Sequence, residues 1–140
     1  MAPVTRVLDA MYPLRHRRLW LGTWLAMVAA VVVLSLIPPP PLPPGAFEGI
    51  DKVEHVLGYF ALSAMGSALF ARMPTRARIA AALVALGVGV EIAQGQWTAT
   101  RTPDLLDAVA NTFGVLLGVL ATPLRRLLVW VDRMGENARG

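Results

Sequence analysis

The sequence predicts an all-α membrane protein with four transmembrane helices and both termini in the cytoplasm. Two observations support this fold class. Hydrophobic residues make up 56% of the chain and charged residues 16%, which leaves too little polar surface for a water-soluble domain of 140 residues. Basic residues are also divided unequally among the segments that flank the apolar runs, and this division predicts topology. We treat residues 1–140 as a single membrane domain.

The first span is expected at about 19–37. This run contains no charged residue, and its nineteen residues are enough to cross about 30 Å of hydrocarbon as a helix. Arg15, Arg17 and Arg18 precede it. The run is too long for the apolar core of a signal peptide and ends in the prolines of 38–41 rather than at a small-residue cleavage site. We therefore interpret it as a transmembrane helix.

Three further spans are expected at about 53–71, 78–96 and 103–121. The proline-rich segment 38–50 comes before the second span and cannot be helical. Asp51 and Glu54 have the spacing of an N-cap and its capping partner.

The loop between the second and third spans is expected to hold Arg72, Arg76 and Arg78 around Pro74. The last span has start signals of its own: Thr102 as N-cap, Pro103 as the first helical residue, and Asp104 as a first-turn acid.

Two short amphipathic helices are expected at the membrane surface. One covers the N-terminal segment, where Val4, Val7, Leu8 and Met11 have helical spacing, although a frayed terminus is an equal alternative. The other is expected at about 123–134.

Charge counting places the two sides of the membrane. Eleven basic residues fall in the N-terminal segment, the loop between the second and third spans, and the C-terminal segment, whereas the other two loops hold only Lys52 and Arg101. The positive-inside rule then places both termini in the cytoplasm. Polar residues recur at the opposite, extracytoplasmic ends of the last three spans. Those that we expect to form one ligand-binding pocket are Asp51, Lys52, His55, Tyr59, Glu91, Gln94, Arg101, Asp104, Asp107 and Asn111.

One face of the last span carries much of this polarity. Asp104, Asp107, Asn111, Gly114 and Gly118 are spaced by three and four residues, so they share one side of a helix. The two glycines form a G-x-x-x-G pair, which indicates that this face meets neighbouring helices rather than lipid.

Several functions remain open for this cluster. A carboxylate near mid-bilayer costs about 2.5–3.5 kcal/mol, so such residues need partners and mark either a ligand site or a packing network. His55, Asp107 and Glu91 are the candidates for acid–base catalysis on a lipid-linked phosphate or sugar, with Lys52 and Arg101 as phosphate ligands. A divalent metal bound through oxygen and imidazole, by Asp51, His55, Glu91 and Asp107, is a further alternative. Since no dedicated metal-ligand spacing occurs, we expect no metal and no cofactor.

Other classes of function are disfavoured. The chain has no cysteine, which excludes disulfides, zinc–thiolate sites and a thiol nucleophile. No P-loop and no G-x-S-x-G motif occurs. The net charge of +4 comes from arginines that flank apolar segments, and no aromatic-interleaved basic patch is present, so we expect no nucleic-acid partner.

Three motifs resemble the VanZ-like family of small bacterial membrane proteins, over about 51–118. They are D-K-x-x-H-x-x-x-Y from Asp51, E-x-x-Q from Glu91, and R-x-x-D-x-x-D-x-x-x-N-x-x-G from Arg101. The resemblance implies a multi-pass protein of the bacterial plasma membrane. Founding members of the family are linked to low-level teicoplanin resistance. The proline run and Pro103 depart from the family pattern.

The sequence therefore predicts a cell-envelope protein that binds membrane lipids, through a lipid headgroup or a lipid-linked cell-wall precursor, and that is more simply a binding protein than an enzyme. The alternatives are a membrane-embedded acid–base hydrolase or transferase, and a structural or assembly protein whose polar network serves packing. The sequence sets no oligomeric state.

Overall fold

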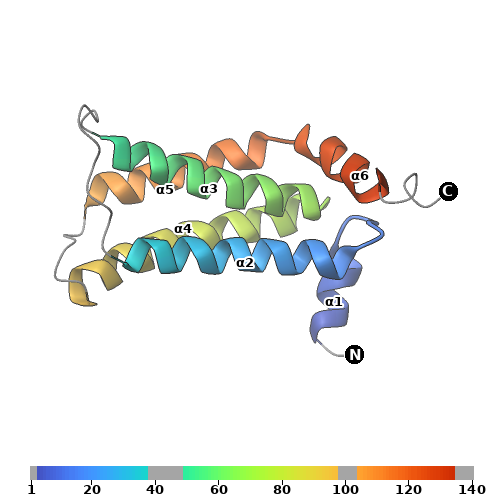
Figure 1. Ribbon diagram of the computed structural model, residues 1–140, viewed down its shortest axis with the longest axis horizontal. Coiled ribbons are helices and arrows are strands. Elements are labelled where there is room, and N and C mark those ends of the chain that lie inside the picture. The colour runs from blue at the N-terminus through green and yellow to red at the C-terminus, as the bar shows by residue number, and fades with distance from the viewer. Residues whose placement is uncertain (1–2, 38–48, 98–103, 135–140) are drawn as a thin grey trace.

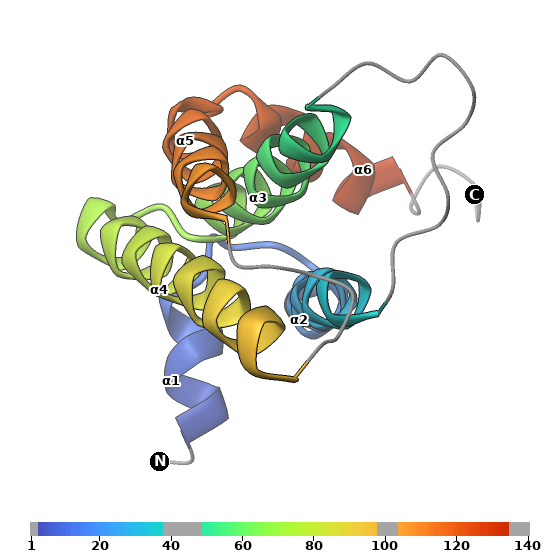
Figure 2. The same ribbon diagram turned by 90° about the vertical axis from the view of Figure 1, so that its left-hand side faces the viewer.

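The fold, seen in a computed structural model that describes residues 3–37, 49–97 and 104–134, is a bundle of helices, and no strand occurs among these residues. The helices are α1 (Pro3–Ala10), α2 (Arg17–Leu36), α3 (Ile50–Leu69), α4 (Met73–Trp97), α5 (Leu105–Leu120) and α6 (Leu124–Met134). The four long helices alternate in direction, with α3 and α5 in one layer and α2 and α4 in the other (Figures 1 and 2). The all-α prediction is confirmed.

The contact between α3 and α5 depends on two glycines. A Cβ atom added at Gly114 would lie 2.4 Å from the carbonyl oxygen of Val56, and one added at Gly118 would lie 2.6 Å from Cβ of Ser63. Ser63 in turn donates a 2.7 Å hydrogen bond from its hydroxyl to the carbonyl of Val115. The G-x-x-x-G face thus packs against a neighbouring helix, as the spacing predicts.

The outer surface of the bundle is apolar. Helix α2 has no buried residue, although an 18-residue stretch of it has a mean hydropathy of 2.2. The large hydrophobic side chains exposed on α5 are Leu105, Leu106, Val109, Phe113, Leu116, Leu117 and Leu120. A continuous apolar surface of this kind is unfavourable in water and is typical of helices that face lipid.

Helices α2 and α4 are each long and apolar enough to cross a membrane, and a third span is added if α5 and α6, which meet at a bend of 68°, are taken together. The expected spans at 53–71 and 103–121 do not meet these criteria as single helices. Helix α3 begins with a charged turn that contains Asp51, Lys52 and Glu54, and α5 has only 16 residues. The structure therefore supports two to three candidate spans by length and composition.

The expected starts of α3 and α4 are wrong. Helix α3 is preceded by Gly49 as N-cap at φ 92°, without a side-chain cap, whereas Asp51 lies inside the first turn and pairs with Lys52. Helix α4 already begins at Met73, because proline is tolerated in a first turn, so Arg76 and Arg78 are helical rather than in a loop. Thr102 and Pro103 lie outside the described residues.

The N-cap of α5 is Asp104, whose carboxylate accepts a 2.8 Å hydrogen bond from the amide of Leu106. An aspartate satisfies a free amide of the first turn well at this position. Asp104 therefore precedes the helix, and its expected place as a first-turn acid is wrong.

Helix α6 supplies charged side chains to the ends of two other helices. The carboxylate of Asp132 accepts hydrogen bonds from the amides of Arg15 and His16 and from the indole of Trp20, at 2.6, 3.2 and 2.8 Å, next to the N-terminus of α2. The guanidinium of Arg125 donates to the carbonyls of Ser67, Ala68 and Phe70 at the end of α3. Both charges complement the helix dipole that they face.

Candidate functional site

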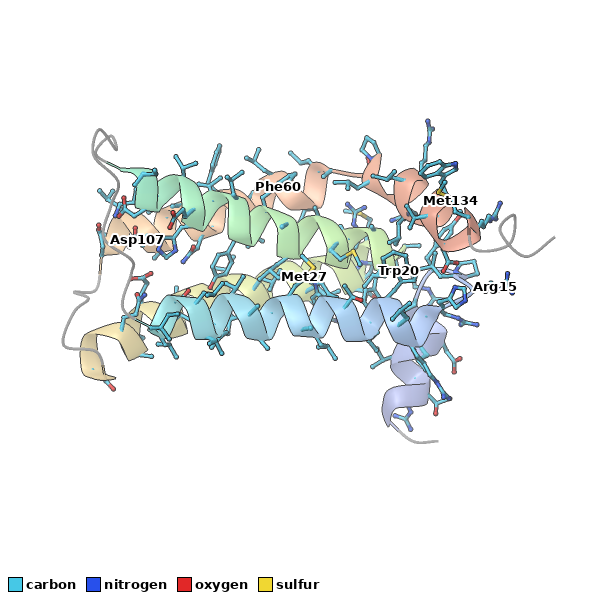
Figure 3. The ribbon with its side chains drawn as sticks, viewed as in Figure 1. Arg15, Trp20, Met27, Phe60, Asp107 and Met134 are labelled. Carbon is cyan, nitrogen blue, oxygen red and sulfur yellow. The ribbon has the colours of Figure 1, made fainter. Side chains whose placement is uncertain are left out.

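The polar residues of α3, α4 and α5 meet at the end of the bundle opposite α1 and α6. Asp107 lies at that end, whereas Arg15, Trp20 and Met134 lie at the other (Figure 3). Alternating helix directions place the start of α3, the end of α4 and the start of α5 side by side (Figure 1). The structure brings the predicted site residues together there, except for Gln94, which bonds to α2, and Arg101, which lies outside the described residues.

Lys52 is the ionic centre of this cluster. Its ammonium lies 2.7 Å from Oδ2 of Asp51, 2.7 Å from Oδ2 of Asp104 and 2.6 Å from Oδ1 of Asp107. The side chain is 29% exposed, and that of Asp107 is 13% exposed. Lys52 thus joins α3 to α5 and is already neutralised by carboxylates, so its expected role as a phosphate ligand requires it to leave them.

His55 lies one turn deeper and is held in one orientation. Its Nδ1 atom lies 3.0 Å from Oδ1 of Asn111, and its Nε2 atom lies 3.6 Å from Oδ2 of Asp107. The amide oxygen of Asn111 can only accept, so Nδ1 carries the proton and Nε2 presents its lone pair to the carboxylates when the ring is neutral. His55 is therefore set up as a base or a ligand.

Glu91 brings a second buried carboxylate from α4. It is 6% exposed, and its Oε2 atom accepts a 3.3 Å hydrogen bond from the backbone amide of Asp104. Its Oε1 atom, the hydroxyl of Tyr59 and the amide nitrogen of Asn111 are buried without a hydrogen-bond partner among the described residues. These three side chains leave unused polar atoms inside the bundle, where each costs about 1–3 kcal/mol.

Gln94 has a different place from the one expected of a ligand residue. It is 2% exposed and donates a 2.8 Å hydrogen bond to the carbonyl of Ser35, which ties α4 to the last turn of α2. This contact positions the end of α4 beside the site. Gly87 supports the arrangement from the same helix, since a Cβ there would lie 3.2 Å from Asn111 and 3.4 Å from the ring of Tyr59.

The electrostatics of Asp104 follow from its exposed position beside Lys52. The hydrogen bond from the Lys52 ammonium, with a second from the Leu106 amide, lowers the pKa of the Asp104 carboxyl below its usual 3.8. Asp104 is therefore a carboxylate at neutral pH and binds the lysine in its charged form.

Two hollows adjoin the cluster. A groove of about 570 Å³ between α4 and α5 is lined by Val88, Glu91, Ile92, Gly95, Gln96, Asp104, Leu105 and Ala108. A smaller cavity of about 210 Å³ between α2 and α3 is lined by Val31, Leu34, Ser35, Glu54, His55, Gly58 and Tyr59. Among the described residues, the polar cluster thus borders a hollow on two sides rather than being packed shut.

Two contributors were not found from the sequence. Ser35 is a single serine near the end of an apolar run, and it takes part through its backbone carbonyl, which no side-chain pattern reveals. Gly87 lies on α4 four residues before Glu91, and that one-turn spacing is the only signal that could have placed it on the site face.

Comparison of the chain with protein-family models, with curated proteins and with solved structures finds no match.

Proposed function

We propose that this protein is a four-span protein of the bacterial plasma membrane that binds the polar headgroup of an amphiphile from the extracytoplasmic side. The ligand classes are a membrane lipid headgroup and a lipid-linked cell-wall precursor. One observation carries the proposal: Glu91 and Asp104 belong both to the ionic cluster and to the wall of the open groove between α4 and α5.

The groove has a polar part and an apolar part, as an amphiphile does. Its polar end holds Glu91 and Asp104, and its other walls are mostly apolar. Ala108 also lines a second, apolar hollow of about 350 Å³ that continues along α5 past Phe113 and Leu116. A headgroup at the carboxylates would therefore leave its hydrocarbon chain on an exposed apolar helix face, where a lipid chain already belongs.

The cluster also restricts the headgroup chemistry. Carboxylates accept hydrogen bonds and attract cations, and Lys52 is shared among three of them. Ligands with several hydroxyl or ammonium donors, such as sugar or ethanolamine headgroups, fit these acceptors. A phosphate would be bound by Lys52 after it leaves the carboxylates, or by Arg101.

The proposed topology rests on the positions of the charges. The starts of α2 and α4 lie at the end that holds α1 and α6 (Figure 1), and the arginines of 15–18, of 72–78 and of α6 belong to these segments. Lys52 lies at the other end with the acidic residues. An end rich in arginine faces the cytoplasm under the positive-inside rule, which puts the groove on the outer side.

Native mass spectrometry of the protein in lipid nanodiscs would test the binding. Nanodiscs would carry either phosphatidylethanolamine or a polyprenyl-diphosphate sugar in a phosphatidylcholine background. We expect one of the two to remain bound to the wild type and to be lost from His55→Ala/Asp107→Ala and from Ala108→Trp, which fills the groove. Leu106→Trp, at a residue 63% exposed on the same helix and outside both hollows, should retain it.

Equal retention by the wild type and the His55→Ala/Asp107→Ala variant would exclude headgroup binding at this site. If the wild type and its variants all fold and none of them retains a lipid, the result would favour the alternative that the polar network serves only helix packing.

A second candidate function is acid–base catalysis on the same class of lipid. The observation in its favour is the pair formed by His55 and Asp107, 3.6 Å apart, with Asn111 orienting the ring. Turnover of the polyprenyl-diphosphate sugar with a bell-shaped pH profile would support an enzyme. Absence of product over a broad lipid panel, with binding intact, would support the binding protein.

We also propose that the chain is a VanZ-like protein, on the strength of the three motifs that begin at Asp51, Glu91 and Arg101. This proposal adds a cellular readout. Expression of the wild type in a sensitive host should raise the teicoplanin concentration needed for inhibition, whereas His55→Ala/Asp107→Ala should not. Equal inhibition of both strains would remove the link to glycopeptide resistance.

A further inference from the structure

The cluster contains three side chains from three helices that surround one point. A ring nitrogen of His55 and one carboxylate oxygen each from Glu91 and Asp107 lie within 4.8 Å of one another. Within this group, Nε2 of His55 lies 3.6 Å from Oδ2 of Asp107. Ligands of a tetrahedral zinc ion at 2.0–2.2 Å are separated by about 3.3–3.6 Å, so this pair needs little movement to hold a metal.

His55 is oriented as metal-binding histidines usually are. A ligating imidazole donates its other N–H to a carbonyl or carboxylate, which fixes the tautomer and the ring plane. Here Nδ1 of His55 lies 3.0 Å from Oδ1 of Asn111, which is 1% exposed. The lone pair of Nε2 is therefore directed toward the carboxylates before any ligand arrives.

Glu91 provides the independent sign that something else is bound. It is 6% exposed, and its Oε1 atom has no hydrogen-bond partner among the described residues, while Oε2 accepts the Asp104 amide. An ionised carboxylate inside a membrane protein is costly unless it is paired or coordinates a metal. A cation beside the free oxygen would compensate for its burial.

The charge balance favours a dication. The Lys52 ammonium pairs with Asp51, Asp104 and Asp107, and among the described residues no ion pair joins the fourth carboxylate, that of Glu91, to a cation. Lys52 lies on Oδ1 of Asp107 and leaves Oδ2 directed toward His55. The lysine and a cation can therefore occupy different oxygens of the same carboxylate.

We propose that His55, Glu91 and Asp107 bind a divalent transition-metal ion of the Zn²⁺ or Mn²⁺ class. Mixed imidazole and carboxylate ligands suit these ions, whereas Mg²⁺ and Ca²⁺ prefer oxygen alone. Three protein ligands leave a coordination position open for water or for a phosphate or hydroxyl group. Occupancy by the metal does not depend on the lipid, so this site and the proposed headgroup binding can fail separately.

The test uses the full-length protein, stripped with a chelator and reloaded in detergent without added lipid. With Zn²⁺ alone, we expect one ion per chain by elemental analysis and a higher thermal unfolding midpoint. Glu91→Gln, which keeps the side-chain shape, should weaken zinc binding at least tenfold and lose the thermal shift. Glu54→Gln, an exposed acid one residue before His55, and His16→Ala, at the other end of the bundle, are the matched controls and should bind as the wild type does.

A spectroscopic readout covers variants that fold poorly. With Mn²⁺ alone, the pulsed electron paramagnetic resonance spectrum of the wild type should show coupling to one imidazole nitrogen, and His55→Ala should lose it. The proposal is overturned if the wild type binds no more Zn²⁺ than Glu91→Gln, or if bound Mn²⁺ shows no nitrogen coupling. A metal site without lipid retention would support this inference and count against the proposed function alone.

Discussion

The ammonium of Lys52 lies 2.6 Å from Oδ1 of Asp107, so a cation on the first turn of α3 holds a largely buried carboxylate on α5. The same ammonium also binds Asp51 and Asp104. Lys52 thus links the start of α3 to the start of α5 through ion pairs.

Removal of that cation should destabilise the protein. In Lys52→Met, three carboxylates repel one another without a counter-charge, and we expect a loss of about 1–3 kcal/mol, between the values for surface and buried pairs. Lys52→Arg should recover part of it. Chemical denaturation in detergent measures the effect, with Arg126→Met on the exposed face of α6 as control. Equal stability of the two methionine variants would contradict a central role for Lys52.

Two glycine substitutions should separate α3 from α5. In Gly114→Ala the new methyl group meets the backbone of Val56 at 2.4 Å, and in Gly118→Ala it meets the backbone of Phe60 and Ala64 at 2.7 Å. Backbone cannot rotate away as a side chain can, so we expect each to cost at least about 1–3 kcal/mol.

Gly89→Ala is the matched control for these variants, because nothing lies within 4 Å of its added Cβ on α4. Alanine is a better helix former than glycine by about 1 kcal/mol, so this variant should be neutral or more stable. The unfolding midpoints of the three variants decide. A similar midpoint for Gly114→Ala and Gly89→Ala would refute the close packing.

Acid should weaken the folded state through Asp104. Lys52 lowers the folded pKa of this carboxyl below 3.8, its ordinary value. The resulting stability is therefore fully present above the unfolded pKa and is lost as pH falls through the lower folded pKa. Unfolding midpoints measured from pH 6 down to pH 2 should fall more steeply for the wild type than for Asp104→Asn. Parallel curves would show that the Lys52–Asp104 pair contributes nothing.

Asp132 should matter far more than its place on a surface helix suggests. Asp132→Leu leaves the amides of Arg15 and His16 and the indole of Trp20 without their acceptor. Each unsatisfied buried donor costs about 1–3 kcal/mol, so we expect a large loss of stability or of expression. Asp132→Asn, which keeps an acceptor oxygen but removes the charge, should be milder.

The control is Asp9→Asn, which removes an exposed acid at the same end of the protein. Intrinsic fluorescence, to which Trp20 contributes with three other tryptophans, follows unfolding, and the denaturation midpoint ranks the three variants. A midpoint for Asp132→Leu as high as that of Asp9→Asn would show that the contacts are dispensable.

The sequence predicts the helices and the convergence of the polar residues better than it predicts their boundaries and partners. Apolar length and the three–four spacing of Asp107, Asn111, Gly114 and Gly118 are strong signals, because burial requires them. Helix starts are weaker signals. Asp51 and Asp104 are both good capping residues, yet Gly49 takes the first cap and Asp104 the second, since backbone geometry and Lys52 decide between similar candidates.

The partners of Asp132 and Gln94 could not be predicted, because both are tertiary contacts to backbone. In the pattern of α6, Asp132 falls among the charged residues, yet it is 6% exposed beneath the start of α2. Gln94 fits the polar motif of α4 but donates to the carbonyl of Ser35. Periodicity identifies a face, and only the packed bundle shows which atoms that face meets.

The two oxygens of Asp107 have different neighbours, Lys52 at one and His55 at the other. A cation bound at Oδ2, beside His55, draws negative charge away from Oδ1 and weakens the attraction between Oδ1 and Lys52. An anion that binds the Lys52 ammonium and draws it away from Asp107 would raise the affinity of His55 and Asp107 for a cation. By thermodynamic reciprocity, the bound cation would raise the affinity for the anion by the same factor. A single carboxylate can thus make two unlike ligands cooperative without any helix moving.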